Sequence, residues 1–137
     1  MNLKKITAFI AQHHLLTLAT CKDNIPYCAN CFYAFKSDPF SFIIATDDAT
    51  RHAKEALQNE NIAGAIALET KEIGKIQGLQ FCGLMQRANL GEKALYLATF
   101  PYALALNPTI WTLHVSYIKF TDNTLGFGKK LEFNFEV

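Results

Sequence analysis

The segment 26–36 constrains the fold more than any other part of the chain, because it is apolar on both faces of a strand. With the alternation of an extended backbone, one face carries Tyr27, Ala29, Cys31, Tyr33 and Phe35, and the other carries Cys28, Asn30, Phe32 and Ala34. Such a strand needs a core on one side and a second cover on the other. Only 18% of the residues are charged, against roughly 25% in an average soluble domain. We therefore expect a second copy of the chain to supply part of that cover.

Periodicity predicts seven strands and three helical regions. Apolar residues recur at helical spacing from Leu3 to His13, and a second helix is expected to be capped by Asp47 or Asp48 and to run to about Gln58. A third helical region, residues 91–106, is interrupted at Pro101. Strands are expected from residue 16 to a polar turn at 22–24, and at 26–36, 40–46, 62–69, 75–87, 110–120 and 131–137. This order predicts an α+β fold built around a largely antiparallel sheet.

Two features of the later strands indicate the curvature of a small barrel. Gly78 and Gly83 lie inside the strand 75–87, where a residue without a side chain allows a bend or a close approach of two backbones. In the strand 110–120 the apolar parity changes near Tyr117, which predicts a β-bulge there.

Size and charge exclude several classes of protein. With 137 residues, no internal repeat and no linker, the chain is expected to form a single domain over residues 1–137. Its 13 basic and 12 acidic residues give a net charge of +1, so neither a broad nucleic-acid surface nor a membrane-binding patch is expected. The apolar pattern near the N-terminus is broken by polar residues at 12–14, unlike the core of a signal peptide. We expect a cytoplasmic protein.

Four cysteines include the segment Cys28-Ala29-Asn30-Cys31, which has the C-x-x-C spacing of many metal and redox sites. In a strand, residues three apart point to opposite faces, so Cys28 and Cys31 are poorly placed to share a zinc ion. No second C-x-x-C and no H-x-x-x-H accompanies them. We expect no metal site, and reduced thiols that are partly buried.

The segment 42–57, a strand that leads directly into a helix, carries the clearest chemistry. Thr46, Thr50, Arg51 and His52 cluster at this junction. A helix N-terminus offers unpaired N–H groups and the positive end of the helix dipole. Two hydroxyls, a guanidinium and an imidazole beside it can hold a phosphate group. A capped helix with a solvated arginine would give the same local pattern, so the residues alone leave both interpretations open.

The segment 42–57 resembles the FMN-phosphate segment of the pyridoxamine 5′-phosphate oxidase-like split barrels. In those proteins a strand ends at a Thr, and a Ser/Thr-Arg/Lys-Lys triplet opens the helix. The resemblance implies that Ala45 and Thr46 approach the flavin, and that Thr50, Arg51 and His52 approach its phosphate. His52 stands where a Lys is usual, so its contact is expected to weaken as the imidazole loses its proton.

The resemblance extends over nearly the whole chain. It includes Leu18-Ala19-Thr20, the run from Gly78 to Gly83 and the late Trp111, while residues 28–33, 50–53 and 118–130 resemble one small bacterial branch of the superfamily. It implies an FMN-binding split β-barrel with about six to seven strands, and a homodimer that holds the flavin at the subunit interface.

Three further candidates come from the same resemblance. Asn30 and Gln80 become candidates for the polar edge of the flavin ring, and Trp111 for a contact from the second subunit. Their ordinary alternatives are a hydrogen-bonded core amide for Asn30, a solvated strand residue for Gln80 and simple core packing for Trp111.

The sequence also departs from the true oxidases. Residues 112–116 lack the Arg-Leu segment with which those enzymes hold their phosphorylated substrate, so pyridoxamine phosphate oxidation is not expected. The favoured interpretation is an FMN-dependent oxidoreductase in which the flavin transfers a hydride or electrons on a small substrate. The alternatives are a non-catalytic FMN carrier or redox sensor and, less favoured, a haem-binding split barrel with ligands among His13, His14, His52 and His114.

Overall fold

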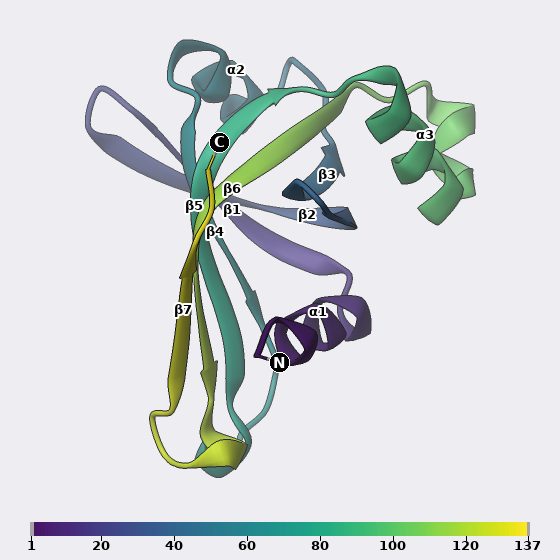
Figure 1. Cartoon of the computed structure of the whole chain (residues 1–137). Coiled ribbons are helices and arrows are strands. Elements are labelled where there is room, and N and C mark those ends of the chain that lie inside the picture. Colours follow the sequence, from purple (N-terminus) through teal and green to yellow (C-terminus); the bar gives the residue numbers. More distant parts are fainter. Residues whose placement is uncertain (1, 137) are drawn as a thin grey trace.

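The computed structural model, which describes residues 2–136, contains the seven strands that periodicity predicts. The helices and strands are α1 (Asn2–Gln12), β1 (Leu15–Lys22), β2 (Ile25–Ser37), β3 (Phe40–Ala45), α2 (Arg51–Gln58), β4 (Asn61–Ala67), β5 (Gln77–Arg87), α3 (Leu90–Thr99), β6 (Ile110–Asp122) and β7 (Lys130–Asn134) (Figure 1). Three short 3-10 helices, η1 (Ile73–Lys75), η2 (Pro101–Leu106) and η3 (Asn123–Leu125), lie in the connections. None of the helices in this part of the chain is long and apolar enough to cross a membrane. Val137, which we expected to end the last strand, lies outside the described residues.

The sheet closes into a barrel because β3 is paired along both of its edges. The strand order is β3-β2-β1-β4-β5-β6-β7, and β3 also pairs with β6 through residues 41–45. β7 pairs only with residues 117–121 of β6. The sheet therefore continues beyond the closed barrel as a long extension, which runs downward in Figure 1. All pairings are antiparallel, and the predicted α+β split barrel is confirmed.

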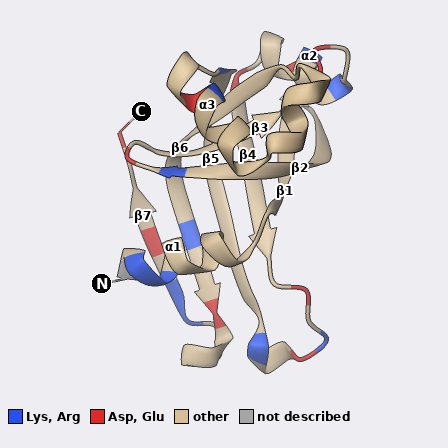
Figure 2. Ribbon diagram, turned by 90° about the vertical axis from the view of Figure 1, so that its right-hand side faces the viewer, with Lys and Arg blue, Asp and Glu red and all other residues tan. Residues whose placement is uncertain are grey.

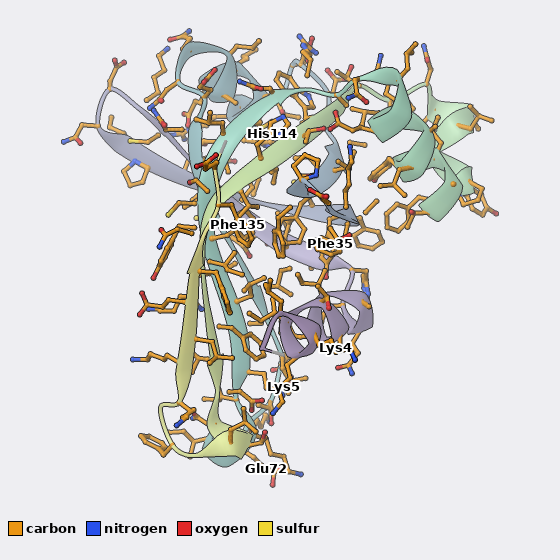
Figure 3. All side chains as sticks on the ribbon, in the orientation of Figure 1. Lys4, Lys5, Phe35, Glu72, His114 and Phe135 are labelled. Atoms are coloured by element: carbon orange, nitrogen blue, oxygen red, sulfur yellow. The ribbon has the colours of Figure 1, made fainter. Side chains whose placement is uncertain are left out.

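Aromatic side chains fill the interior of the barrel. Trp111, Phe42, Phe81 and Phe120 are among its fully buried side chains, and the rings of Phe42 and Phe81 lie 4.7 Å apart. Near the end of the chain, the ring of Phe135 stacks on that of Phe40 with centroids 4.7 Å apart, and the ring of Phe35 lies 4.9 Å from Phe40. Phe135 and Phe35 are labelled in Figure 3. Large rings of this kind bury roughly 150–250 Å² each, so they supply much of the apolar contact that holds the wall of the barrel together.

A β-bulge lies at Ser116 in β6, one residue from its predicted position. Cys82 pairs with Tyr117, whereas the next residue, Gly83, pairs with Val115. The Ser116 hydroxyl donates to the carbonyl of Cys82 at 3.1 Å, which holds the extra residue in place. The two strands approach so closely here that a Cβ at position 83 would collide with the carbonyl of His114.

Two predicted boundaries are wrong. α2 is capped by Thr50, not by Asp47 or Asp48, because the Thr50 hydroxyl accepts from the N–H of Ala53 at 3.3 Å. Asp47 instead accepts from the N–H of Ala49 at 2.7 Å and forms a turn ahead of the helix. The connection between β4 and β5 contains η1, so these two strands are shorter than expected at this end.

The outer face of β2 is only partly covered within one chain. Ala34 packs beneath α3 in a small cluster with Ile43 and Tyr96. Cys28 and Phe32 on the same face are exposed. The second cover that the sequence calls for is therefore incomplete in a single copy.

The close approach at the bulge gives a test of the fold. Gly83→Ala should lower the free energy of unfolding by at least about 2 kcal/mol, because the backbone of β6 must move to admit the methyl group. Gly74→Ala is the matched control, since a Cβ at position 74 meets nothing within 4 Å. Urea denaturation of both variants checks this, and equal stability of the two would contradict the assigned register.

Candidate functional site

The junction between β3 and α2 brings Thr46, Thr50 and His52 together. The hydroxyl oxygen of Thr46 lies 2.5 Å from Nε2 of His52 and 3.3 Å from the hydroxyl oxygen of Thr50. Nε2 of His52 also lies 3.4 Å from the Thr50 hydroxyl oxygen. Three of the four residues predicted to form a phosphate cradle thus converge beside the first turn of α2.

We call the group formed by Thr46, Thr50 and His52 the triangle. The backbone on each side of it is fixed by hydrogen bonds. The N–H of Thr46 donates to the carbonyl of Thr109 at 3.0 Å, and the indole N–H of Trp111 donates to the carbonyl of Thr46 at 3.2 Å. Four residues later, the Thr50 hydroxyl donates to the carbonyl of Asp47 at 2.8 Å while it caps the helix. The two hydroxyls are therefore held by the end of a strand and the start of a helix.

Arg51 opens α2, but no hydrogen bond within residues 2–136 joins its guanidinium to the side chains of Thr46, Thr50 and His52. Its Nε donates to Oε2 of Glu55 at 2.9 Å, and its central carbon lies 4.1 Å from the centre of the Tyr27 ring. Glu55 is nearly buried and also accepts from the hydroxyl of Thr20 at 2.9 Å. Because Nε is the atom that binds Glu55, the two terminal amino groups of the guanidinium remain for a ligand.

A small cavity beside Arg51 gathers positive charge. It has a volume of about 280 Å³ and is lined by Lys22, Arg51 and Lys54 together with Ala49 and Glu55. Three cations and one carboxylate give the cavity a net positive charge, at the N-terminal end of an eight-residue helix whose dipole adds to it. Its charge suits a phosphate group.

Sequence reasoning missed Lys22, Lys54 and Glu55 as parts of this site. Glu55 had a usable signal, because a carboxylate four residues after an arginine lies on the same helix face. Lys22 comes from the end of β1, and nothing in its local sequence places it beside α2.

Burial and neighbouring charges set the protonation states. Burial lowers the pKa of His52 below its ordinary value of 6.5, and the nearby Glu55 carboxylate opposes this only in part. The hydrogen bond from Arg51, followed by that from Thr20, lowers the pKa of Glu55. At neutral pH the site therefore combines a neutral imidazole with an ionised carboxylate and free cations.

A second ion pair fixes the loop between β3 and α2. The carboxylate of Asp48 accepts two hydrogen bonds from Arg87, both at 2.7 Å. The Arg87 guanidinium lies 4.3 Å from the centre of the Trp111 ring. Arg87 lowers the pKa of Asp48, chiefly through these hydrogen bonds. Because 39 residues separate the partners, no local sequence pattern could have paired them.

Ala45 and Thr46 also line a second cavity. Its volume is about 560 Å³, and residues 106–109 form the opposite wall. This volume falls within the roughly 300–1,000 Å³ of small-molecule sites. The predicted approach of a ligand to Ala45 is therefore sterically open, although contact with a flavin stays a prediction.

Asn30 and Gln80 lie on the outer face of the sheet, in one row across four strands. Asn30 pairs with Thr17, Thr17 with Ala65, and Ala65 with Gln80. Three strand spacings of about 4.8 Å separate them by roughly 14 Å. The Thr17 hydroxyl donates to the Asn30 side chain at 3.0 Å, and both Asn30 and Gln80 are exposed. No hydrogen bond within residues 2–136 joins either of them to the triangle, so their contacts with a flavin ring stay predictions.

Trp111 is only 2% exposed and holds Thr46 through its indole N–H. Within one chain it positions the site and belongs to the core. Its contact across a subunit interface also stays a prediction.

Cys28 and Cys31 of the C-x-x-C segment are free thiols and lie as the strand alternation predicts. Cys28 is exposed and Cys31 is buried, on opposite faces of β2, and burial raises the pKa of Cys31 to about 11. Within the described residues, no three His, Cys, Asp or Glu side chains gather in a way that would hold a metal ion.

Comparison with known proteins connects this geometry to a protein family. No family model matches the chain. A UPF0306 protein of Photorhabdus laumondii is 42% identical over 135 residues, which cover 95% of this chain and 94% of that protein.

Solved structures share the fold at low sequence identity. A haem-binding protein from Mycobacterium smegmatis matches with a TM-score of 0.76 and 16% identity over 91% of this chain, which spans only 54% of that protein. An FAD-binding protein from Mesorhizobium loti matches with a TM-score of 0.69 and 10% identity, over 84% of this chain and 90% of that protein. Proteins with this fold thus include flavin-binding and haem-binding examples.

The lowered pKa of His52 predicts how stability depends on pH. As the pH falls below about 6.5, the unfolded chain takes up a proton at His52 before the folded chain does, so the free energy of unfolding decreases. Urea denaturation of the ligand-free protein at about pH 7.5 and about pH 5.5 should therefore show a larger loss for the wild type than for His52→Gln. Glu55 stays ionised over this range and contributes nothing to the difference. Equal losses would show that the folded protein binds this proton as readily as the unfolded chain.

Proposed function

The chain belongs to the UPF0306 family, and we propose that it is an FMN-binding flavoprotein of the pyridoxamine 5′-phosphate oxidase-like superfamily. The observation that carries the proposal is the gathering of phosphate-binding groups at the start of α2. The hydroxyls of Thr46 and Thr50 lie beside its first turn, and the cavity lined by Arg51, Lys22 and Lys54 lies at the same end of the helix. The flavin-binding neighbour with the same fold supports the choice of cofactor class.

The residues present fit a terminal monophosphate. The terminal amino groups of Arg51 and the ammonium groups of Lys22 and Lys54 match the charge of a phosphate dianion, and the helix dipole favours it further. Glu55 holds the Arg51 side chain through Nε, so the guanidinium is oriented before a ligand arrives. His52 adds a proton-dependent donor, because its imidazole can give a charged N–H to the phosphate only after it takes up a proton. Binding at this site should therefore be tighter at mildly acidic pH.

The protein's part in the reaction is to bind and orient the cofactor. Bound flavin would supply hydride or electron transfer, and no side chain of this chain is assigned a chemical step. The open cavity beside Ala45 and Thr46 leaves room for a small substrate. We place the protein in the cytoplasm, where its four cysteines stay reduced.

Two alternatives make different predictions. A non-catalytic FMN carrier or redox sensor would bind the same ligand but would not oxidise NADH or NADPH in steady state, whereas an oxidoreductase that takes electrons from a nicotinamide would. A haem protein is suggested by the haem-binding neighbour, and its absorbance spectrum would differ from that of a flavoprotein. The charge of the α2 site favours the phosphate of FMN.

Arg51 provides the sharpest test of the phosphate assignment. A charge-assisted hydrogen bond contributes roughly 1.5–3 kcal/mol, so removing Arg51 should weaken FMN binding by about ten- to a hundredfold. Riboflavin has no phosphate, and its affinity should not change. Flavin fluorescence titration with both ligands measures this directly.

The controls separate binding from folding. Arg51→Ala alone leaves the nearly buried Glu55 without its arginine, so the substitution is made in a Glu55→Gln background and compared with Glu55→Gln itself. Lys71→Ala removes one positive charge at an exposed residue far along the sequence and should leave both affinities unchanged. If FMN affinity survives the loss of Arg51, or if riboflavin weakens equally, the guanidinium belongs to the scaffold.

The proposal also includes a homodimer with the flavin between its subunits. The exposed outer face of β2, with Cys28, Asn30 and Phe32, needs a cover that a single chain does not supply. A second copy would provide it and would bring a further wall to the flavin site.

A further inference from the structure

The region formed by α3 and η2, residues 90–106, exposes an apolar surface that an ordinary solvent-facing helix would not. Leu90, Tyr102, Leu104 and Leu106 are 69–93% exposed. None of the six residues of η2 is buried, and residues 94–106 include no charged side chain. Figure 2 shows this region without charge beyond its first turn. We call this surface the α3–η2 ridge.

A hollow lined by uncharged residues, which could receive an apolar ridge, lies elsewhere on the barrel. It has a volume of about 570 Å³ on the outer face of β1, β4 and β5. Its floor is a row of small side chains, in which Ala19 pairs with Ala63 and Ala63 pairs with Cys82. None of the residues that line it, all of them within the described chain, is charged. We call this surface the β1–β4–β5 hollow.

The two surfaces cannot meet within one chain as it is folded. α3 packs on β2, β3 and β6, whereas the hollow lies over β1, β4 and β5 on a different part of the barrel wall. A twofold pair of chains resolves this, because the ridge of each copy can enter the hollow of the other.

The ridge is also continuous with the face of β2 that the proposed dimer covers. The ring of Phe100, at the junction of α3 and η2, lies 5.7 Å from the ring of Phe32 on that face. Phe32 is 50% exposed and stands two residues from Asn30. One apolar surface therefore runs from the ridge on to the outer face of β2.

We infer that the α3–η2 ridge of one copy docks in the β1–β4–β5 hollow of a second copy, so that a twofold dimer contains this contact twice. Tyr102 alone can bury roughly 150–250 Å², and each copy contributes both a ridge and a hollow. The other exposed side chains of the ridge and Phe32 of the β2 face add further apolar area toward the roughly 800 Å² per partner of a standard stable interface. The inference rests on the homodimer of the proposed function and does not require flavin.

Docking of the ridge would also affect the cavity beside Ala45 and Thr46 in the candidate site. Leu106, the last residue of the ridge, lines the cavity beside Ala45 and Thr46. A docked ridge therefore fixes one wall of that cavity, and the wall becomes mobile when the dimer separates. Loss of the dimer should weaken FMN binding at least several-fold, although every phosphate-binding group remains in place.

The test disrupts each side of the contact separately. Leu104→Glu places a charge on the ridge, Ala63→Glu places one in the hollow, and each should raise the dimer dissociation constant at least about tenfold. Phe127→Glu is the matched control, because Phe127 is also 80% exposed but lies outside both surfaces. Analytical ultracentrifugation at micromolar concentration measures the mass, 15.4 kDa for one chain, and thermal melts confirm that each variant is folded.

A cross-link provides a measurement that does not depend on disruption. Leu104→Cys should form an intermolecular disulfide with Cys82 of the partner subunit when oxidised glutathione accepts the two electrons, and Cys82→Ser should abolish it. A monomeric wild type, or a Leu104→Glu protein that is as dimeric as the wild type, would overturn the inference. A wild-type dimer that depends on both surfaces yet binds no FMN would support the inference and refute the proposed function.

Discussion

β3 hydrogen-bonds to β2 on one edge and to β6 on the other, and this double pairing closes the barrel. The contact continues past the end of β3, where Thr46 donates to Thr109 and accepts from the buried indole of Trp111. Arg87 lies against the same indole and holds Asp48 two residues further on. The loop that leads into α2 therefore starts from a fixed point. If the pairing between β3 and β6 were lost, Thr46 would no longer be held in its position beside Thr50 and His52.

The charges of the site follow from where α2 begins. The helix starts at Arg51, so its positive end faces a cavity that already holds the side chains of Lys22 and Lys54. Glu55 reduces this charge but also binds Arg51 and Thr20, which joins the helix to β1. Such a carboxylate limits the repulsion among the cations in the ligand-free protein. The neutral His52 leaves one further positive charge to be gained by protonation when an anion arrives.

Local sequence patterns predict those features of the fold and of the site that depend on residues close together in the chain. Alternation places the strands, and a change of parity places the bulge within one residue of Ser116. Thr46, Thr50 and His52 could be grouped because seven residues contain them all. The helix cap was mistaken because Asp47, Asp48 and Thr50 are all good capping residues, and only the folded loop shows that the aspartates are engaged elsewhere. Lys22 and Arg87 were missed because each lies beside the start of α2 or the loop before it, to which it is distant in the sequence. The incomplete cover of β2 is visible only once α3 is placed.

The other conclusions about function depend on the proposal that the start of α2 binds the phosphate of FMN. The most direct measurement offers the purified protein an equimolar mixture of FMN, FAD, riboflavin and haem, removes unbound ligand by gel filtration and identifies what is retained by mass spectrometry after denaturation. The site has cations for one terminal phosphate, and within residues 2–136 no second cluster of cations lines it for the rest of a dinucleotide, so FMN should be retained, with one molecule per chain. Retention of haem, or of riboflavin and FAD as readily as FMN, would contradict the account.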